Sequence, residues 1–163
     1  MGFDAQGIPH LRIEHRVVPA GPSIIDTLAN MAFYYGAVTA LCEMEPAIET
    51  RIKFDKARDN FYAAARLGLR AQMSWTDQQV HAVHELIEEE LLPLAESGLM
   101  QLGVAKDDRE SYLDIIAARV CTGMNGANWQ RAFVAKHGAD MTALTAAYIE
   151  RQESGEPVHE WTI

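Results

Sequence analysis

Helical periodicity recurs along most of this 163-residue sequence, whereas the alternation typical of a strand occurs in one segment, residues 10–18. One face of that segment carries Leu11, Ile13, His15 and Val17, and the other carries Arg12, Glu14 and Arg16. A single strand leaves its backbone donors and acceptors unpaired. We therefore expect a mainly α-helical fold of about five to six helices. Its short N-terminal β element should pair with a segment outside this sequence, with the tail, or with a second copy of the chain.

The helices can be placed from the spacing of apolar residues and from residues that begin or end helices. They are expected at residues 24–42, 55–67, 76–93, 107–122, 129–135 and 141–152. With 48% hydrophobic residues and no repeat or flexible linker, the chain has the composition of one globular domain. We expect that domain in three parts: a strand and turn at 1–22, a helical region at 23–153, and an extended tail at 154–163.

Several residues mark the expected helix ends. Ser23 and Asp140 are suited to cap the first and last helices, and Thr76-Asp77-Gln78-Gln79 has the spacing of a capping box. Gly68 and Gly123 occur where glycine commonly ends a helix. Pro93 should kink or end the third helix.

The first predicted helix is the most apolar part of the chain. Its stripe consists of Ile24, Leu28, Met31, Tyr35, Val38 and Cys42. It approaches membrane length, but it contains Asp26, Thr27 and Asn30 and lacks flanking basic anchors. We expect a central helix buried on most sides. Cys42 and Cys121 are expected to be small buried hydrophobes without a disulfide, and Phe61 and Ala64 should face inward from the second helix.

Net charge narrows the classes of partner. A formal charge of −9 opposes association with a polyanion, so a nucleic-acid surface is not expected and any anionic ligand must be held by local arginines. The N-terminus lacks the pattern of a secretory signal peptide, which favours a cytoplasmic protein.

The strongest candidate site is the charged face of the strand. Residues two apart on a strand lie roughly 7 Å apart on one face, which places Glu14 between Arg12 and Arg16. A carboxylate is a suitable Mg²⁺ ligand, and guanidinium groups bind phosphate or carboxylate oxygens. The alternative is an exposed strand face on which the charges neutralise one another.

Other clusters leave alternatives open. His81, His84, Glu85 and Glu88 would share a helical face as a metal site or as a solvated surface. Positive charge gathers, for an anionic ligand or as a solvated face, at Arg51, Lys53, Lys56, Arg58, Arg66 and Arg70. The segment 122–130 is interpreted as a tight helix joint with Trp129 in the core. The roles of His159, Glu160 and Trp161 stay undecided.

Four stretches carry a family resemblance. They are residues 7–23 (GIPHLRIEHRVVPAGPS), 60–69 (NFYAAARLGL), 126–131 (GANWQR) and 154–161 (SGEPVHEW). The first resembles the late active-site strand of the bacterial glutamate-cysteine ligase family of the second type, and the others resemble the C-terminal region of that family. Members are similar in catalytic fold to glutamine synthetase, so the resemblance implies that the strand belongs to a larger α+β catalytic unit.

The resemblance also implies an activity, in which ATP phosphorylates the γ-carboxylate of glutamate and an amine attacks the acyl phosphate. On that basis Glu14 is expected to bind Mg²⁺, and Arg16 and, more loosely, Arg12 are expected to act on nucleotide phosphate or substrate carboxylate. Family members are longer, and an N-terminal catalytic region supplies most of their cavity. The chain is therefore expected to be the C-terminal part of such a cytoplasmic ligase of glutathione biosynthesis, inactive and without bound cofactor on its own. The alternative is a non-catalytic helical protein-interaction domain derived from such a ligase. For either function we expect no membrane or nucleic-acid partner, and the N-terminal strand offers an edge for self-association.

Overall fold

The computed structural model describes residues 2–10 and 20–163 and is mainly helical, as the apolar spacing predicts. In chain order the elements are β1 (Gly2–Phe3), β2 (Pro9–His10), α1 (Ile24–Cys42), α2 (Ile48–Arg51), α3 (Phe54–Leu67), the 3₁₀ turn η1 (Gly68–Arg70), β3 (Gln72–Ser74), β4 (Val80–Ala82), α4 (Val83–Leu86), the π-helical turn η2 (Ile87–Leu91), α5 (Leu92–Gln101), α6 (Lys106–Thr122), α7 (Gly126–His137), α8 (Met141–Ser154) and the 3₁₀ turn η3 (Val158–Glu160).

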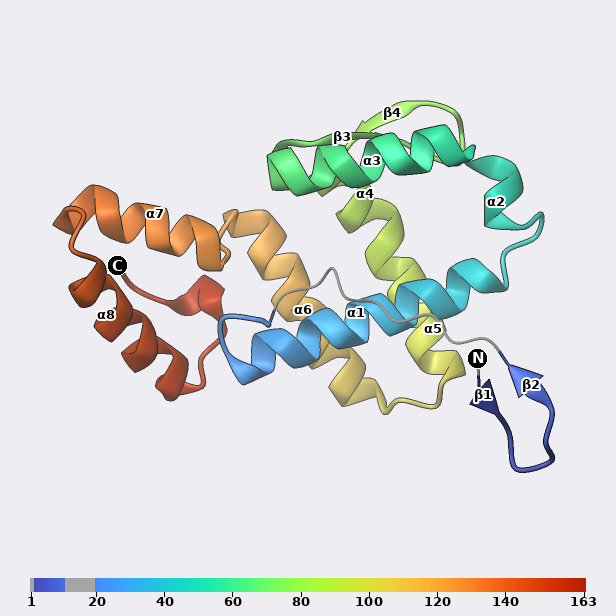
Figure 1. Cartoon of the computed structure of the whole chain (residues 1–163), viewed down its shortest axis with the longest axis horizontal. Helices are drawn as coiled ribbons and strands as arrows, with labels where there is room; N and C mark the ends of the chain where they lie inside the picture. Colours follow the sequence, from blue (N-terminus) through green and yellow to red (C-terminus); the bar gives the residue numbers. More distant parts are fainter. Residues whose placement is uncertain (1, 11–19) are drawn as a thin grey trace.

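Helix α1 lies at the centre of the molecule and crosses α5 and α6 (Figure 1). Its backbone approaches α5 closely, because a Cβ atom at Gly36 would overlap the carbonyl group of Ala95, and one at Gly98 would overlap the carbonyl group of Gly36. The buried side of α1 is accordingly made of small residues, namely Ala29, Ala32, Gly36, Ala37 and Ala40, together with Asp26. Small residues let two helix backbones pack at short range, and this contact organises the core.

Four large apolar residues of α1 face the other way, although Ile25 and Phe33 pack against the core, which corrects the prediction of a helix buried on most sides. Ile24 is 79% exposed, Met31 50%, Tyr35 54% and Val38 38%. Cys42 is also exposed, as is Cys121, so the prediction that the cysteines are buried is wrong, although both are free as expected. Apolar spacing identified the helix but not its buried face, because close backbone contact selects small residues instead of large ones.

The third predicted helix begins later than expected. Residues 72–74 and 80–82 form an antiparallel hairpin instead, in which Met73 pairs with His81. Asp77 accepts a hydrogen bond from the Gln79 amide at 2.9 Å, so it stabilises the hairpin turn and does not cap a helix. Asn60 of α3 holds the hairpin by exchanging hydrogen bonds with the backbone of Ser74, at 2.7 and 2.9 Å.

Helical structure starts at Val83 and continues through Pro93 to Gln101. Pro93 was predicted to kink or end this helix, and it does not end it. The π-helical turn Ile87–Leu91 directly precedes it and changes the winding there. Local π adjustments are a recognised way for a helix to absorb such an irregularity.

The helix ends near the C-terminus agree with their sequence signals. Asp140 accepts hydrogen bonds from the amides of Thr142 and Ala143, and Gly123 adopts the left-handed conformation with φ 65°. The tail differs from the extended segment predicted, because it forms η3 and folds back against α7 and α8 (Figure 1). Trp161 there packs against Trp129 of α7 with ring centroids 5.6 Å apart, which confirms Trp129 as a core residue.

The described part of the N-terminal strand pairs within the chain. Pro9–His10 lies antiparallel to Gly2–Phe3, away from the helices in Figure 1. The remainder of the predicted strand, residues 11–18, lies outside the described residues.

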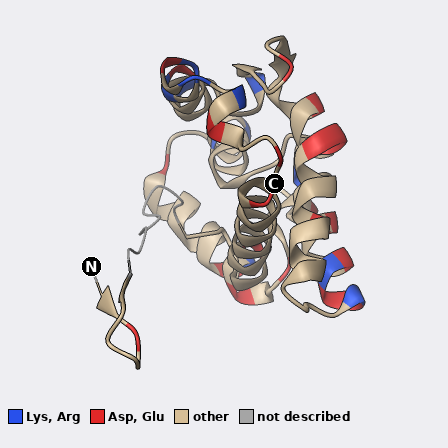
Figure 2. Cartoon of the chain, turned by 90° about the vertical axis from the view of Figure 1, so that its right-hand side faces the viewer, with Lys and Arg blue, Asp and Glu red and all other residues tan. Residues whose placement is uncertain are grey.

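Helix α3 is more exposed than the sequence predicts. Phe61 is 51% exposed and α3 buries no residue fully, so the inward position predicted for Phe61 is wrong. Much of the Lys and Arg in Figure 2 lies in the upper part of the molecule, where α2 and α3 lie.

No helix within the described residues is both long enough and apolar enough to cross a membrane.

Candidate functional site

The predicted site residues Arg12, Glu14 and Arg16 lie outside the described residues. Their proposed roles therefore stay predictions. The first described residues that follow them, Ala20, Gly21 and Pro22, line an open pocket with a volume of about 870 Å³.

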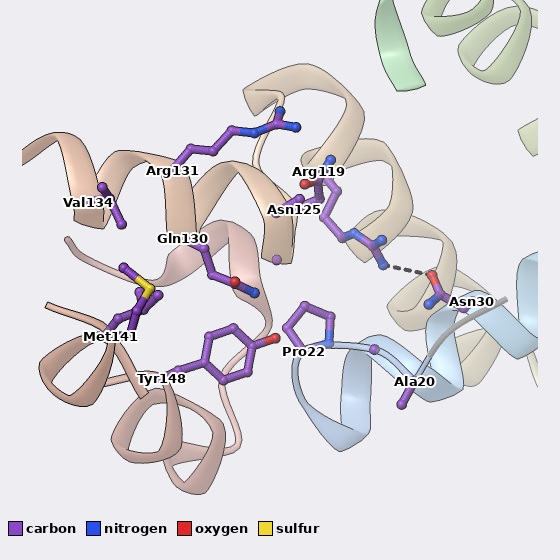
Figure 3. A pocket seen from close by; sticks show the side chains of 14 residues that line it. Ala20, Pro22, Asn30, Arg119, Asn125, Gln130, Arg131, Val134, Met141 and Tyr148 are labelled. Atoms are coloured by element: carbon purple, nitrogen blue, oxygen red, sulfur yellow. Dashed lines mark hydrogen bonds between the residues drawn. The ribbon is translucent and has the colours of Figure 1, made fainter. Parts of the chain in front are cut away.

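This first pocket lies between the start of α1, the end of α6, and helices α7 and α8 (Figure 3). Its polar lining includes Asn30, Arg119, Asn125, Gln130, Arg131 and Tyr148, and its apolar lining includes Val134, Met141 and Leu144. The Gln152 side chain of α8 donates a hydrogen bond to the carbonyl oxygen of Pro22 at 3.0 Å, which ties α8 to the turn before α1. The pocket thus combines cationic and amide groups on one side with an apolar surface on the other.

Arg119 carries a fixed positive charge in this pocket. Its guanidinium donates to the Asn30 side chain at 2.8 Å and lies 3.6 Å from Oδ1 of Asp26. Burial lowers the pKa of Arg119 below its usual range, and the Asp26 carboxylate opposes that shift. Because a guanidinium titrates so far above neutral pH, Arg119 stays charged there.

Asp26 is fully buried beneath the pocket and joins three parts of the chain. Its Oδ2 accepts hydrogen bonds from the hydroxyl of Ser23 at 2.9 Å and from the amide of Val158 in the tail, also at 2.9 Å. With Arg119 as its ionic partner, Asp26 links the start of α1, the tail and α6. This carboxylate has a structural task and is shielded from any ligand in the pocket.

Tyr148 supplies a neutral hydroxyl to the same pocket. Burial raises its pKa above the usual 10.0, with the negative charge of Asp26 acting in the same direction. The hydroxyl is therefore a protonated hydrogen-bonding group at neutral pH. A Cβ atom at Gly126 would lie 3.2 Å from the Tyr148 oxygen, so glycine lets the start of α7 approach this side chain.

A second pocket, of about 560 Å³, adjoins the first and shares Asn125, Ala127 and Arg131 with it. Arg66 and Arg70 contribute from the end of α3 and from η1, and Arg131 contributes from α7. Arg131 donates to the Asn128 side chain at 3.2 Å, while Asn128 donates to the carbonyl oxygen of Gly123 at 2.6 Å. Three guanidinium groups from separate elements therefore line one concave surface.

The chemistry of the two pockets favours binding of anions. Among the described residues that line them there is no Asp, Glu, His or Cys. Such a surface, rich in guanidinium and amide groups, can hold and orient a phosphate or carboxylate group. Within the predicted site, Glu14 is the residue expected to bind metal.

The basic cluster predicted around the second helix separates into different roles. Arg51 donates to the backbone oxygens of Glu45 and Pro46, and Arg58 forms an ion pair with Asp59 at 3.0 Å. Arg66 and Arg70 instead line the second pocket, so two of the six basic residues fit the alternative of an anionic ligand.

The histidine clusters do not form the predicted arrangement. His81 lies on β4, whereas His84 is on α4, so the single helical face assumed for them is wrong. Over residues 2–10 and 20–163 no group of three or more His, Cys, Asp or Glu side chains is placed to hold a metal ion. His159 lies 3.7 Å from Glu160 in the tail, and Trp161 is a core residue there.

Sequence reasoning did not identify Arg119 as a site residue. It also did not predict that Arg131 lines the same pocket as Arg66 and Arg70. A signal for Arg119 was present, because it lies four and three positions after Ile115 and Ile116, on the apolar face of its helix, where a charged side chain is rarely buried without a partner. The meeting of the other three arginines depends on how α3 and α7 pack.

Comparison of the chain with models of protein families, with curated proteins and with solved structures finds no match.

Proposed function

We propose that this chain is the C-terminal part of an ATP-dependent carboxylate-amine ligase similar to the glutamate-cysteine ligase family of the second type. The observation that supports the proposal most is spatial. The four stretches that carry the resemblance are far apart in sequence, and described residues from each of them lie at the two adjoining pockets or directly behind them.

Each stretch makes a distinct contribution. The end of residues 7–23 and the start of α7 line the first pocket, and the end of residues 60–69 lines the second. Val158 and Trp161, from residues 154–161, pack against Trp129 and so hold α7 from behind. A shared pocket is a physical reason for dispersed stretches to keep a common pattern.

In this proposal the parent enzyme transfers the terminal phosphoryl group of ATP to the γ-carboxylate of glutamate. An amine then attacks the acyl phosphate, forms the amide bond and releases inorganic phosphate. Glu14 would hold Mg²⁺, and Arg16 and Arg12 would bind nucleotide phosphate or substrate carboxylate. Preorganised cations of this kind stabilise the negative charge that shifts during phosphoryl transfer.

The proposal also explains the exposed apolar stripe of α1. Contiguous exposed apolar surface commonly marks an interaction site. The catalytic N-terminal region of a parent ligase would be a suitable partner for Ile24, Met31 and Tyr35. The same stripe favours the second candidate, a non-catalytic helical domain that binds a partner protein.

The test is to express this chain together with the coding region directly upstream of it and to measure ATP turnover with Mg²⁺, glutamate and a panel of amino acids and amines. We expect phosphate release that depends on glutamate, and loss of Mg²⁺-ATP use in the variant Glu14→Gln. The 163-residue chain alone should be inactive. An upstream region without a ligase cavity, or unchanged kinetics in Glu14→Gln, would favour the interaction domain.

A further inference from the structure

We propose that the pocket formed by Arg66, Arg70, Arg131 and the start of α7 binds the phosphate group of a small organic molecule. The residues of this site differ from the strand residues to which the proposed function assigns phosphate, and the inference holds whether or not the chain belongs to a ligase.

The first argument is charge that is not neutralised. None of the ion pairs among the described residues includes Arg66, Arg70 or Arg131. The chain has 23 acidic and 14 basic residues, so acidic partners are plentiful elsewhere on the surface. Three arginines line one pocket that has no carboxylate among its described lining residues, so a dianion bound there would be attracted to all three.

The second argument is the way the donors are held. Asn128 receives a hydrogen bond from Arg131 and is itself anchored to the carbonyl oxygen of Gly123, so Arg131 is oriented from its own helix. Arg70 lies in the short turn η1, which Gly68 enters with φ 56° and which a hydrogen bond from the Ala71 amide to the Gly68 oxygen closes. The guanidinium of Arg131 is thus held in advance and loses less freedom when it binds an oxyanion, and the backbone that carries Arg70 is fixed by the turn.

The N-terminus of α7 adds further positive potential to the same pocket. Asn125 caps the helix by accepting from the Asn128 amide at 3.0 Å. The amides of Gly126 and Ala127 belong to the first turn, whose N–H groups have no acceptor within the helix. Ala127 lines the pocket, so the positive end of the helix lies beside the three arginines.

The number and direction of these donors favour phosphate over a lone carboxylate. A carboxylate offers two oxygens and one charge, whereas a phosphate monoester offers three oxygens and nearly two charges, which suits cations approaching from α3, η1 and α7. The volume of about 560 Å³ exceeds what a bare ion needs.

The adjoining pocket indicates that the ligand is an organic phosphate. It shares Asn125, Ala127 and Arg131 with the arginine pocket and continues to the apolar side chains of Met141 and Leu144 and to the Tyr148 hydroxyl. A molecule with its phosphate among the arginines would reach this surface with its organic part. Small-ligand sites commonly combine an apolar wall with a few polar groups in this way.

The test uses the 163-residue chain and two probes, inorganic phosphate and inorganic pyrophosphate, in calorimetric or NMR titrations at low ionic strength. We expect saturable binding and a rise in the thermal unfolding midpoint. Arg66→Gln, Arg70→Gln and Arg131→Gln should each weaken binding by about tenfold, as expected for loss of one charge-assisted hydrogen bond.

The matched control is Arg58→Gln, which removes the same charge from the same helix α3 but outside the pocket. It should change the affinity by less than about twofold, because Arg58 does not line the pocket and its charge is already paired with Asp59 at 3.0 Å. Equal weakening by Arg58→Gln and Arg66→Gln, or no saturable binding at millimolar phosphate, would overturn the proposal. Absence of ATP turnover in the parent protein would count against the proposed ligase function and not against the phosphate site, because phosphate binding is measured without turnover.

Discussion

The guanidinium of Arg119 in α6 lies 3.6 Å from Oδ1 of Asp26 in α1, and the Asp26 side chain has no exposed surface. The other carboxylate oxygen of Asp26 is occupied by Ser23 and by the amide of Val158. One buried charge therefore fixes the relative positions of α1, α6 and the C-terminal tail. Helices α1 and α6 line the first pocket, and the tail packs behind α7, which also lines it.

Replacing Asp26 should destabilise the whole domain. Asp26→Ala would leave Arg119 without its buried ionic partner and the Val158 amide without an acceptor, and loss of one member of a buried pair costs about 3–5 kcal/mol. Urea unfolding followed by circular dichroism measures this loss. Ser23→Ala is the control, since it removes the cap of α1 and one hydrogen bond to Asp26 but keeps the buried ion pair, and it should cost about 1 kcal/mol. Equal losses in the two variants would mean that Asp26 acts only as part of the cap.

The crossing of α1 and α5 should tolerate no added methyl group. In Gly98→Ala the new Cβ would overlap the carbonyl group of Gly36, so the helices must separate, and overpacking of this kind costs about 1–3 kcal/mol or more. The thermal unfolding midpoint should fall. Glu96→Ala changes an exposed residue of the same helix and should change the free energy of unfolding by less than about 0.5 kcal/mol. A stable Gly98→Ala variant would contradict the close packing.

The C-terminal tail should act as part of the core. Trp161 packs edge-on against Trp129 and Tyr148, and its indole donates to the carbonyl oxygen of Glu156 at 2.8 Å. Trp161→Ala should cost about 3–5 kcal/mol, as for other buried large aromatic residues. Denaturant unfolding monitored by circular dichroism measures this cost.

The neighbouring exposed residue provides the control for the tail. Glu160→Ala should have an effect of less than about 0.5 kcal/mol. If Trp161→Ala and Glu160→Ala unfold at the same denaturant concentration, the tail does not contribute to the core.

Local signals predicted much of the fold. Ser23 caps α1, Asp140 caps α8, and Gly68 and Gly123 end their helices, because each of these effects involves residues within one or two turns. Where two local roles compete, the same reasoning failed. Asp77 has the position of a helix cap and also that of a turn residue, and its bond to the Gln79 amide stabilises the turn of the hairpin.

Features that depend on tertiary packing were not predictable in this way. The exposed stripe of α1 includes Met31 and Tyr35, and it was assigned to the core because large apolar residues normally drive burial. The short approach of Gly36 to Gly98 reverses that preference. The candidate site has the same limitation, since Arg66 and Arg131 are 65 positions apart and share a pocket only once α3 and α7 are in place.

The hairpin should respond to pH through Asp77 and His81, whose Nε2 lies 2.9 Å from the carboxylate. The hydrogen bond to Asp77 raises the pKa of His81 above its usual 6.5, and the charges of Glu90 and Glu85 act in the same direction. The Gln79 amide, followed by His81, lowers the pKa of Asp77 below its usual 3.8. The histidine contribution is complete below pH 6.5 and is lost as pH rises through the raised pKa, whereas the aspartate contribution is present above pH 3.8 and is lost as pH falls through the lowered pKa.

The hairpin should therefore be most protected from amide hydrogen exchange between pH 3.8 and 6.5, and less protected at higher pH. An NMR titration of the His81 ring should give a pKa above 6.5, and Asp77→Asn should lower it toward that value. Asp59→Asn is the control, because it removes an equal charge from the exposed surface of α3, where Asp59 pairs with Arg58. A His81 pKa that shifts equally in both variants would show that net charge, and not the hydrogen bond across the turn, sets its protonation.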